Sequence, residues 1–433
     1  MTLISPSVPA AVQTQIDEKW VAAWLGAIQG PYPVGSPSAQ PDLSLAFPIA
    51  EQGAQDQTFR LMVRPDIWGA HMRIRLSNVL GTRPVRFDGV YVGLQQGSSA
   101  VLRGTNQPVS FAGKSSVEIS AGSSAWSDAI ALPFVQACDP ALLDGRRLAV
   151  SFHVHGQSGP MTWHAKALNT SYISKPGAGS VGACEGEAAF PFSTTSTYFL
   201  DAVDVMAPAD TRVLVAFGDS ITDGSGTTLN GDDRWTDVLA RKLRAAYGNK
   251  VSVVNAGIGG NQIVGPLNYS AQAPFPGGPS AQMRVERDVI GVSGITSVIW
   301  MEGLNDFSRR GNASVEAVKA GMRDVVSRIR AQLPDVRVIG GTLTTALGST
   351  HTAHGHVEQD LKRMELNEFI HISGLFDYVV SFDKATLDPS TGGMKREYVA
   401  DGTLGGPGDK LHPNRAGYQA MAEKIDISRL FNP

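Results

Sequence analysis

Three residues in the second half of the chain have the types and spacing needed for acyl transfer. Ser220 directly follows an apolar run at 212–217, and Asp409 lies three residues before His412 near the C-terminal end. A serine hydroxyl is a weak nucleophile until a base removes its proton, and an imidazole titrates in the right range to do so. A carboxylate can hold the second imidazole nitrogen and fix its tautomer. We therefore predict Ser220 as nucleophile, His412 as base and Asp409 as the residue that orients His412.

Two further residues could stabilise the negative charge that develops when a carbonyl is attacked. Gly260 lies in the glycine-rich turn NAGIGGN (255–261), and Asn305 lies in the segment EGLND (302–306). Preorganised N–H groups at such positions typically contribute about 10²- to 10³-fold in rate. We predict an oxyanion hole formed by the backbone N–H groups of Ser220 and Gly260 and the side-chain amide of Asn305.

The elements that must bring these residues together follow from the hydrophobic pattern after about residue 205. Short apolar runs alternate with amphipathic helical patterns, which predicts a parallel sheet covered by helices on both faces. In such a sheet, ligands bind beyond the carboxyl ends of the strands. All five candidate residues lie in loops that follow a predicted strand or in the last loop of the chain. The predicted strands are 212–217, 251–255, 296–301, 336–340 and 378–382, and the predicted helices lie near 235–246, 315–333 and 358–373, with a last helix opening at Pro413.

The first half of the chain has a different pattern. Its short runs of alternating apolar and polar residues are typical of an antiparallel, jelly-roll-like β-sandwich, with a helical pattern only near 15–24. We therefore predict an all-β accessory domain at 1–205 and an α/β domain at 206–433. The predicted strands of the first half include 58–63, 71–77, 89–94, 115–120, 148–154 and 161–167.

Four segments of the second half resemble the sequence blocks of the SGNH, or GDSL-type, serine esterases: VLVAFGDSITDGSG, VVNAGIGGNQ, MEGLND and DKLHPNRAGYQAMA. This resemblance implies a three-layer α/β/α, flavodoxin-like fold and assigns Ser220, Gly260, Asn305, Asp409 and His412 the roles given above. The spelling within the blocks, together with the first half, is most similar to two-domain arylesterases and acylhydrolases related to xylan-degradation proteins. The expected activity is metal-independent and cofactor-free hydrolysis of short-chain acyl or acetyl esters of carbohydrate or aryl alcohols.

Composition excludes several other classes of protein. The chain has 433 residues, with 37 Lys and Arg against 40 Asp and Glu, for a net charge of −3. A nucleic-acid-binding protein would usually show a basic excess. No apolar run approaches the roughly 18 residues that a membrane-spanning helix needs. The expected partner is a small-molecule or carbohydrate ester, and the oligomeric state is left open.

A second hypothesis makes the chain a carbohydrate-binding or surface protein that uses its β-sandwich, with the second domain as a scaffold. Other features also leave alternatives open. His153, His155 and His164 could bind a metal, although no carboxylate or cysteine completes a ligand set, so a metal site is disfavoured. The pair Trp163–His164 could reach the pocket, but core packing is favoured. The loop HTAHGH (351–356) is interpreted as a polar loop that could line the pocket, and Asp223, Asp232 and Asp233 as a solvated loop.

The compartment is not fixed by the sequence. The first 20 residues lack the charged and apolar regions of a signal peptide, so the protein is secreted or periplasmic if such a peptide was removed and cytoplasmic otherwise. Cys138 and Cys184 are the only cysteines. They form either one disulfide or two buried thiols.

Overall fold

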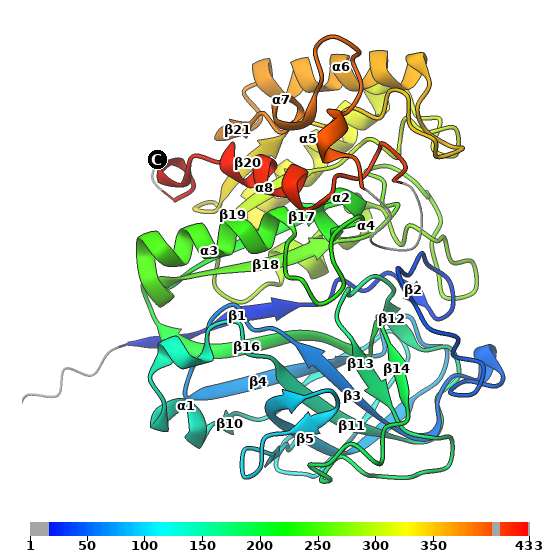
Figure 1. Cartoon of the computed structure of the whole chain (residues 1–433), viewed down its shortest axis with the longest axis vertical. Helices are drawn as coiled ribbons and strands as arrows, with labels where there is room; N and C mark the ends of the chain where they lie inside the picture. Colours follow the sequence, from blue (N-terminus) through cyan, green and yellow to red (C-terminus); the bar gives the residue numbers. More distant parts are fainter. Residues whose placement is uncertain (1–16, 401–407, 432–433) are drawn as a thin grey trace, which may run out of the picture.

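The computed structural model describes residues 17–400 and 408–431. In Figure 1 the strand-rich first half lies below the helix-containing second half. The predicted strands are found in both halves. The helix expected near 15–24 is wrong, because β1 (Glu18–Leu25) is a strand. Residues 15 and 16 lie outside the described residues.

The strand-rich half contains three antiparallel sheets. The first has the order β1-β16-β4-β10 with β9 beside β4, the second β14-β13-β3-β11-β5-β6 with β7 and β8 beside β5, and the third β15-β12-β2. A strand-rich domain is confirmed, and the jelly-roll arrangement stays a prediction. The strands are β1, β2 (Gly30–Pro31), β3 (Gln55–Val63), β4 (His71–Ser77), β5 (Val85–Gly97), β6 (Ala100–Val101), β7 (Gln107–Pro108), β8 (Ser116–Ile119), β9 (Ser124–Trp126), β10 (Ile130–Ala131), β11 (Leu148–Gln157), β12 (Thr162–His164), β13 (Ser171–Ile173), β14 (Phe192–Thr194), β15 (Thr197–Tyr198) and β16 (Leu200–Pro208).

The second half is built on a five-stranded parallel sheet with the order β18-β17-β19-β20-β21. In chain order this is 2-1-3-4-5, the flavodoxin-like order of doubly wound folds. The change of pattern expected after residue 205 falls inside β16, and the parallel sheet begins four residues after that strand ends. The strands are β17 (Arg212–Gly218), β18 (Val251–Gly257), β19 (Ile295–Met301), β20 (Arg337–Gly341) and β21 (Tyr378–Val380).

Helices connect these strands in two groups. α3, α7 and α8 pack together, and α4, α5 and α6 pack together. The last helix begins later than predicted: Pro413 lies outside it, and Asn414 caps it by accepting a hydrogen bond from the Gly417 N–H. The helices are α1 (Pro133–Ala137, in the strand-rich half), α2 (Ser220–Asp223), α3 (Trp235–Tyr247), α4 (Ala281–Val285) with the π-helical turn Glu286–Ile290, α5 (Val315–Gln332), α6 (Val357–Ile372), α7 (Asp383–Thr386) and α8 (Arg415–Glu423).

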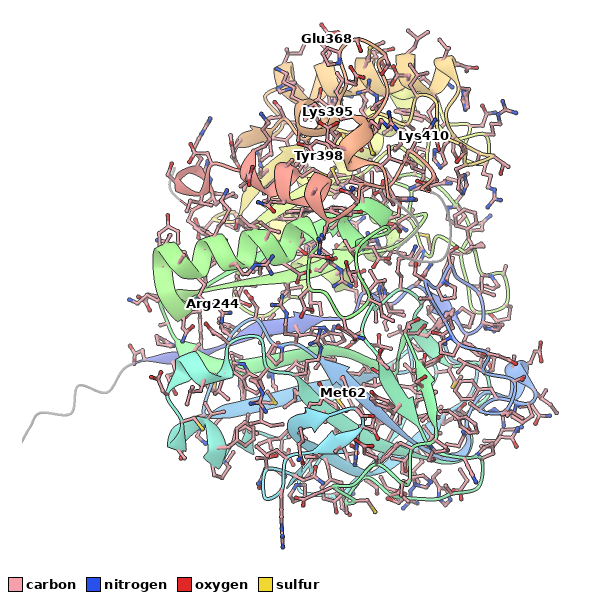
Figure 2. All side chains as sticks on the ribbon, viewed as in Figure 1. Met62, Arg244, Glu368, Lys395, Tyr398 and Lys410 are labelled. Atoms are coloured by element: carbon pink, nitrogen blue, oxygen red, sulfur yellow. The ribbon has the colours of Figure 1, made fainter. Side chains whose placement is uncertain are left out.

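The two halves are packed closely against each other. β1 contacts β18, where the Ser252 hydroxyl donates to the Ala22 carbonyl at 2.7 Å. Arg244 of α3 lies at this junction (Figure 2) and donates hydrogen bonds to Asp66 and Asp144 of the strand-rich half. One cluster of buried apolar side chains runs through both halves. The structure therefore allows residues of the first half to reach the site built on the second.

Both cysteines are free thiols in this structure, and neither is buried. The disulfide and the buried-thiol interpretations are thus both wrong here. Among the described residues, none of the helices has the length and apolar character required to cross a bilayer.

Candidate active site

The nucleophile segment is shaped by a tight turn between β17 and α2. Asp219 caps α2 by accepting a hydrogen bond from the Ile221 N–H at 3.0 Å, and Gly224 ends the helix in a left-handed conformation, with φ of 106°. Ser220 is therefore the first residue of a helix of only four residues, at the carboxyl end of β17. Its side chain is mostly buried but lines a cavity.

Ser220, His412 and Asp409 lie in one line of hydrogen bonds. The distance from Ser220 Oγ to His412 Nε2 is 2.8 Å, and that from His412 Nδ1 to Asp409 Oδ2 is 2.7 Å. Because the Asp409 carboxylate accepts a hydrogen bond from the Nδ1–H of His412, Nε2 of a neutral imidazole is left as the acceptor that faces the serine hydroxyl. Ser220, which lies far from the other two residues in the sequence, is thus within hydrogen-bonding distance of His412.

The Asp409 carboxylate is strongly stabilised in its charged form. Burial alone would raise the pKa of Asp409, but the hydrogen bond and charge of His412 outweigh it, so the pKa lies well below its usual value. The backbone N–H groups of Leu411 and His412 also donate to Asp409, both at 2.9 Å. This turn explains the spacing of three residues between the acid and the histidine.

Gly260 and Asn305 both line the same cavity as Ser220. Within the described ranges 17–400 and 408–431, the Gly260 N–H has no hydrogen-bond acceptor. The Asn305 amide donates to the Asn261 carbonyl at 3.0 Å and lies 3.4 Å from Asp219 Oδ2, a long contact that an incoming oxyanion can replace. Gly260 has a φ of 81°, a conformation that favours glycine.

Buried acids and one buried arginine hold the loops around these groups. Asp306 accepts hydrogen bonds from the N–H groups of Ile263 and Val264 at 2.9 and 3.0 Å, and burial raises its pKa to about 7. Arg284 is almost fully buried and donates to the carbonyls of Gly218 and Ala256, which end two neighbouring strands. Sequence analysis missed Arg284, because no strand-end or motif signal marks it.

The strand-rich half supplies a second support for the glycine-rich turn. His164, at the end of β12, donates through Nδ1 to the Ala27 carbonyl at 2.6 Å, and its Nε2 lies 3.2 Å from Asp223 Oδ1. The other oxygen of Asp223 accepts from the Gly259 N–H at 2.8 Å. Burial alone would lower the pKa of His164, but the charge and hydrogen bond of Asp223 outweigh it and raise the pKa.

These contacts correct the prediction of a solvated loop at Asp223 and Asp232, and the prediction that His164 packs in the core. Asp223 is buried rather than part of a solvated loop, and Asp232 pairs with Arg147 at 2.9 Å. His164 turns toward the nucleophile helix, whereas its neighbour Trp163 packs in the aromatic core against Tyr198.

Lys166 also comes from the strand-rich half and lines the cavity. Its Nζ donates to Ser225 Oγ at 2.7 Å, and this is its only hydrogen bond among the residues that the structure describes. Burial lowers the pKa of Lys166, although the carboxylates of Asp223 and Asp409 oppose the shift. Sequence analysis missed this residue, since strand alternation does not reveal which loop of another domain a side chain meets.

The cavity has a volume of about 580 Å³ and is bordered by five loops of the second half. Gln262, Phe275, Ser308 and Arg310 contribute from two of them. His351 and His354 also line it, and burial lowers the pKa of His354 to about 4. His356 does not: its Nδ1 caps α6 by accepting from the Gln359 N–H. The polar loop predicted at 351–356 therefore supplies two histidines that border the cavity.

The site combines a serine hydroxyl, an imidazole hydrogen-bonded to it and the Gly260 N–H, which has no acceptor among the described residues. These are groups that covalent acyl transfer uses. His153 and His155 lie elsewhere, in the second sheet of the strand-rich half, and are not joined by His164. Among the described residues, they form with Asp56 the one group of histidines and acids close enough to hold a metal, so the expectation that no carboxylate completes a ligand set is wrong.

Comparison with known proteins gives a family match for the second half. A model described as the GDSL-like lipase/acylhydrolase family matches residues 216–420. No curated protein sequence matches the chain.

Several solved structures are similar to about half of the chain. One is Est24, a carbohydrate acetylesterase from Sinorhizobium meliloti, with 15% identity, coverage of 49% of this chain and 95% of that chain, and a TM-score of 0.37. A lipase/acylhydrolase from Enterococcus faecalis has 22% identity, coverage of 50% and 93%, and a TM-score of 0.36. The native aryl esterase of M. smegmatis has 16% identity, coverage of 49% and 95%, and a TM-score of 0.37.

Proposed function

Because residues 216–420 belong to the GDSL-like lipase/acylhydrolase family, we propose that this esterase hydrolyses carboxylic esters through a covalent acyl-serine intermediate. The observation that carries the proposal is the continuous line of hydrogen bonds from Ser220 Oγ through His412 to Asp409, at 2.8 and 2.7 Å. In this proposal residues 206–433 form the catalytic domain and residues 1–205 an accessory domain.

In the first half-reaction, His412 Nε2 takes the proton of Ser220 as Oγ attacks the ester carbonyl. The carbonyl oxygen becomes an oxyanion, which the N–H groups of Ser220, Gly260 and Asn305 stabilise. His412 then gives its proton to the leaving alcohol as the ester C–O bond breaks, which leaves the acyl group on Ser220. Asp409 keeps the imidazole oriented and stabilises its charged form.

In the second half-reaction, water replaces the alcohol. His412 takes a proton from the water, which attacks the acyl carbonyl, and the same donors hold the second oxyanion. When that intermediate breaks down, His412 returns the proton to Ser220 Oγ and the carboxylic acid leaves. No step needs a metal or a cofactor.

The proposed substrates are short-chain acyl or acetyl esters of carbohydrate or aryl alcohols. The cavity supports this choice because its wall combines hydroxyl, amide and cationic groups with few large apolar side chains, of which Phe275 and Leu411 are examples. A long acyl chain would need a more continuous apolar surface. Carbohydrate binding by the strand-rich half alone stays a prediction, and large aromatic side chains of that half such as Trp163, Tyr198 and Phe59 are buried.

The test replaces Ser220 with alanine and measures turnover of a p-nitrophenyl ester chain-length series beside acetylated xylan. We expect a loss of at least about 10⁴-fold in turnover with an unchanged thermal transition. A serine-directed fluorophosphonate should label Ser220 of the wild-type protein. Near-normal hydrolysis by Ser220→Ala, or labelling of a peptide without Ser220, would contradict the mechanism.

A further inference from the structure

A cluster of histidine and aspartate side chains in the strand-rich half takes no part in the proposed esterase chemistry. His153 and His155 lie on β11, Asp56 on β3 and Asp88 on β5. One ligand atom from each of Asp56, His153 and His155 lies within 4.8 Å of the other two. In Figure 1 these three strands lie in the lower part of the molecule, whereas α2, which begins with Ser220, lies in the upper part.

The orientation of His153 is fixed by Asp88. The two residues are paired in register across β11 and β5, and His153 Nδ1 lies 2.7 Å from Asp88 Oδ1. Asp88 can only accept, so Nδ1 carries the proton and the lone pair of a neutral imidazole lies on Nε2. A carboxylate behind a histidine in this way is the usual arrangement for histidines that bind metals, because it sets the tautomer and the ring orientation.

The other nitrogen of His153 faces a second carboxylate. Nε2 lies 3.1 Å from Asp56 Oδ1, and both atoms are acceptors when the imidazole is neutral. Two acceptors at this distance need a positive charge between them, which either a second proton or a metal ion can provide. His153 is almost fully buried, whereas the Asp56 side chain is 44% exposed, so the contact borders solvent on the Asp56 side.

The backbone is distorted where the third side chain joins the cluster. Pairing of β11 with β3 is irregular between Val154 and Gln157, and both Asp56 and Gly156 have positive φ there, of 50° and 66°. Irregularities of this kind re-aim side chains at functional positions. His155 is exposed and its ring lies perpendicular to that of His153, at 6.1 Å between centroids, so its nitrogen is accessible to an ion from solvent.

We propose that Asp56, His153 and His155 bind a divalent transition-metal ion of the zinc class. Two imidazoles and one carboxylate are ligands that Zn²⁺ takes in sites with an open fourth position. Asp88 would be the outer carboxylate that orients His153. The ion would join β3 to β11 at the irregular end of their pairing and balance the two carboxylates. Arg86 is paired in register with His155 on one side and with Glu118 on the other. The Glu118 carboxylate can therefore offset the positive charge of Arg86 beside the proposed ion.

The experiment titrates the full-length, chelator-treated protein with Co²⁺ and records its visible absorption, followed by displacement with Zn²⁺. We expect a spectrum that saturates at one equivalent and disappears when Zn²⁺ is added. His155→Ala and Asp56→Asn should abolish the saturable spectrum. Asp88→Asn should weaken Co²⁺ binding by about 10- to 100-fold, because only the outer partner is changed.

His71→Ala is the matched control, because His71 is also an exposed strand histidine but lies on β4, outside the cluster. It should retain the full Co²⁺ spectrum. His155 is exposed, so His155→Ala should fold normally even if Asp56→Asn does not. A wild-type protein without a saturable spectrum, a spectrum unchanged by His155→Ala, or an equal loss in His71→Ala would overturn the proposal.

Discussion

At the scale of single residues, the carboxyls around the nucleophile are held in opposite protonation states. Asp409 is kept charged by His412, whereas burial raises the pKa of Asp219 from its ordinary 3.8 to about 8. The nearby carboxylates of Glu302 and Asp306 add to the rise, and the Ile221 N–H opposes it. Asp219 is therefore protonated at neutral pH, so the residue before the proposed nucleophile brings no negative charge to the proposed oxyanion site.

This arrangement predicts a pH dependence of stability. The unfolded state releases the Asp219 proton near pH 4, but the folded state keeps it until about pH 8, so the free energy of unfolding should fall as the pH rises between these values. The Asp219→Asn variant has a neutral amide at this position and therefore no carboxyl group that can ionise. Relative to wild type, it should gain more than about 2 kcal/mol in the free energy of unfolding between pH 4 and pH 8.

The measurement is urea denaturation of both proteins across this pH range. Asp335→Asn is a suitable control, because Asp335 is an exposed aspartate far in sequence from the site. A constant difference between Asp219→Asn and wild type would show that Asp219 is ionised in the folded protein throughout.

At the scale of elements, the short strand β12 and the residues after it place two side chains of the strand-rich half beside the catalytic loops. His164 reaches Asp223, which in turn holds the Gly259 N–H next to the predicted oxyanion donor. Lys166 reaches Ser225. The first is a positioning contact that touches no substrate, whereas the second leaves an ammonium group in the cavity wall.

His164→Gln should therefore change both catalysis and the pH dependence of stability. The folded-state pKa of His164 is raised, so its stabilising contribution is fully present below about pH 6.5 and is lost as the pH rises through the folded value. The variant should be most destabilised in acid and approach wild type in alkali. Its kcat should fall by about 10- to 100-fold with a smaller change in KM, because the glycine-rich turn is less well held.

These quantities are measured by chemical denaturation at several pH values and by p-nitrophenyl acetate kinetics. His371→Gln, at an exposed position of α6, is the control. A destabilisation that is independent of pH would mean that His164 is neutral in the folded state.

Lys166→Met tests whether the ammonium group contacts the substrate. The Nζ of Lys166 donates one hydrogen bond to Ser225 Oγ, and the Lys166 side chain lines the cavity. We expect KM for an acetylated oligosaccharide to rise by about tenfold or more, as loss of a hydrogen bond to a charged group predicts. KM for p-nitrophenyl acetate should change less. Lys114→Met, at an exposed position, should change neither value; equal losses on both substrates would assign Lys166 a structural role only.

The sequence predicted the second half well because each apolar run of a parallel sheet is followed directly by its loop. This placed Ser220, Gly260 and Asn305 at one edge, and the family resemblance is confirmed by the match at 216–420. His164 and Lys166 could not be found in this way, since their importance depends on packing between halves. The segment near 15–24 was misread because Trp20, Val21 and Trp24 repeat with near-helical spacing, although tertiary pairing with β16 makes it a strand.

At the scale of the whole molecule, the junction between the halves combines apolar packing with buried ion pairs. Arg64, just after β3, contacts Asp237 of α3 and lies 3.6 Å from Asp232. Arg244 of α3 reaches back to Asp66, whose other oxygen accepts from the Val253 N–H of β18. The same cluster of buried apolar side chains continues across both halves. Separating the two halves would therefore expose apolar side chains and break ion pairs that are buried between them.

We therefore expect the two halves to unfold together. Calorimetry should show a single transition that coincides with loss of ester hydrolysis, with equal calorimetric and van't Hoff enthalpies. Arg64→Met should lower the free energy of unfolding of this one transition by up to about 3 kcal/mol, because it removes the cation closest to the buried Asp237 carboxylate and leaves it the longer contact with Arg234, at 3.7 Å. Lys250→Met breaks the exposed pair with Asp210, in which both side chains are more than half exposed, and should leave the transition almost unchanged. Two separate transitions in the wild-type protein, or in Arg64→Met, would show instead that the strand-rich half is an independent unit, and its side chains would then reach the esterase site through a contact that opens without unfolding either part.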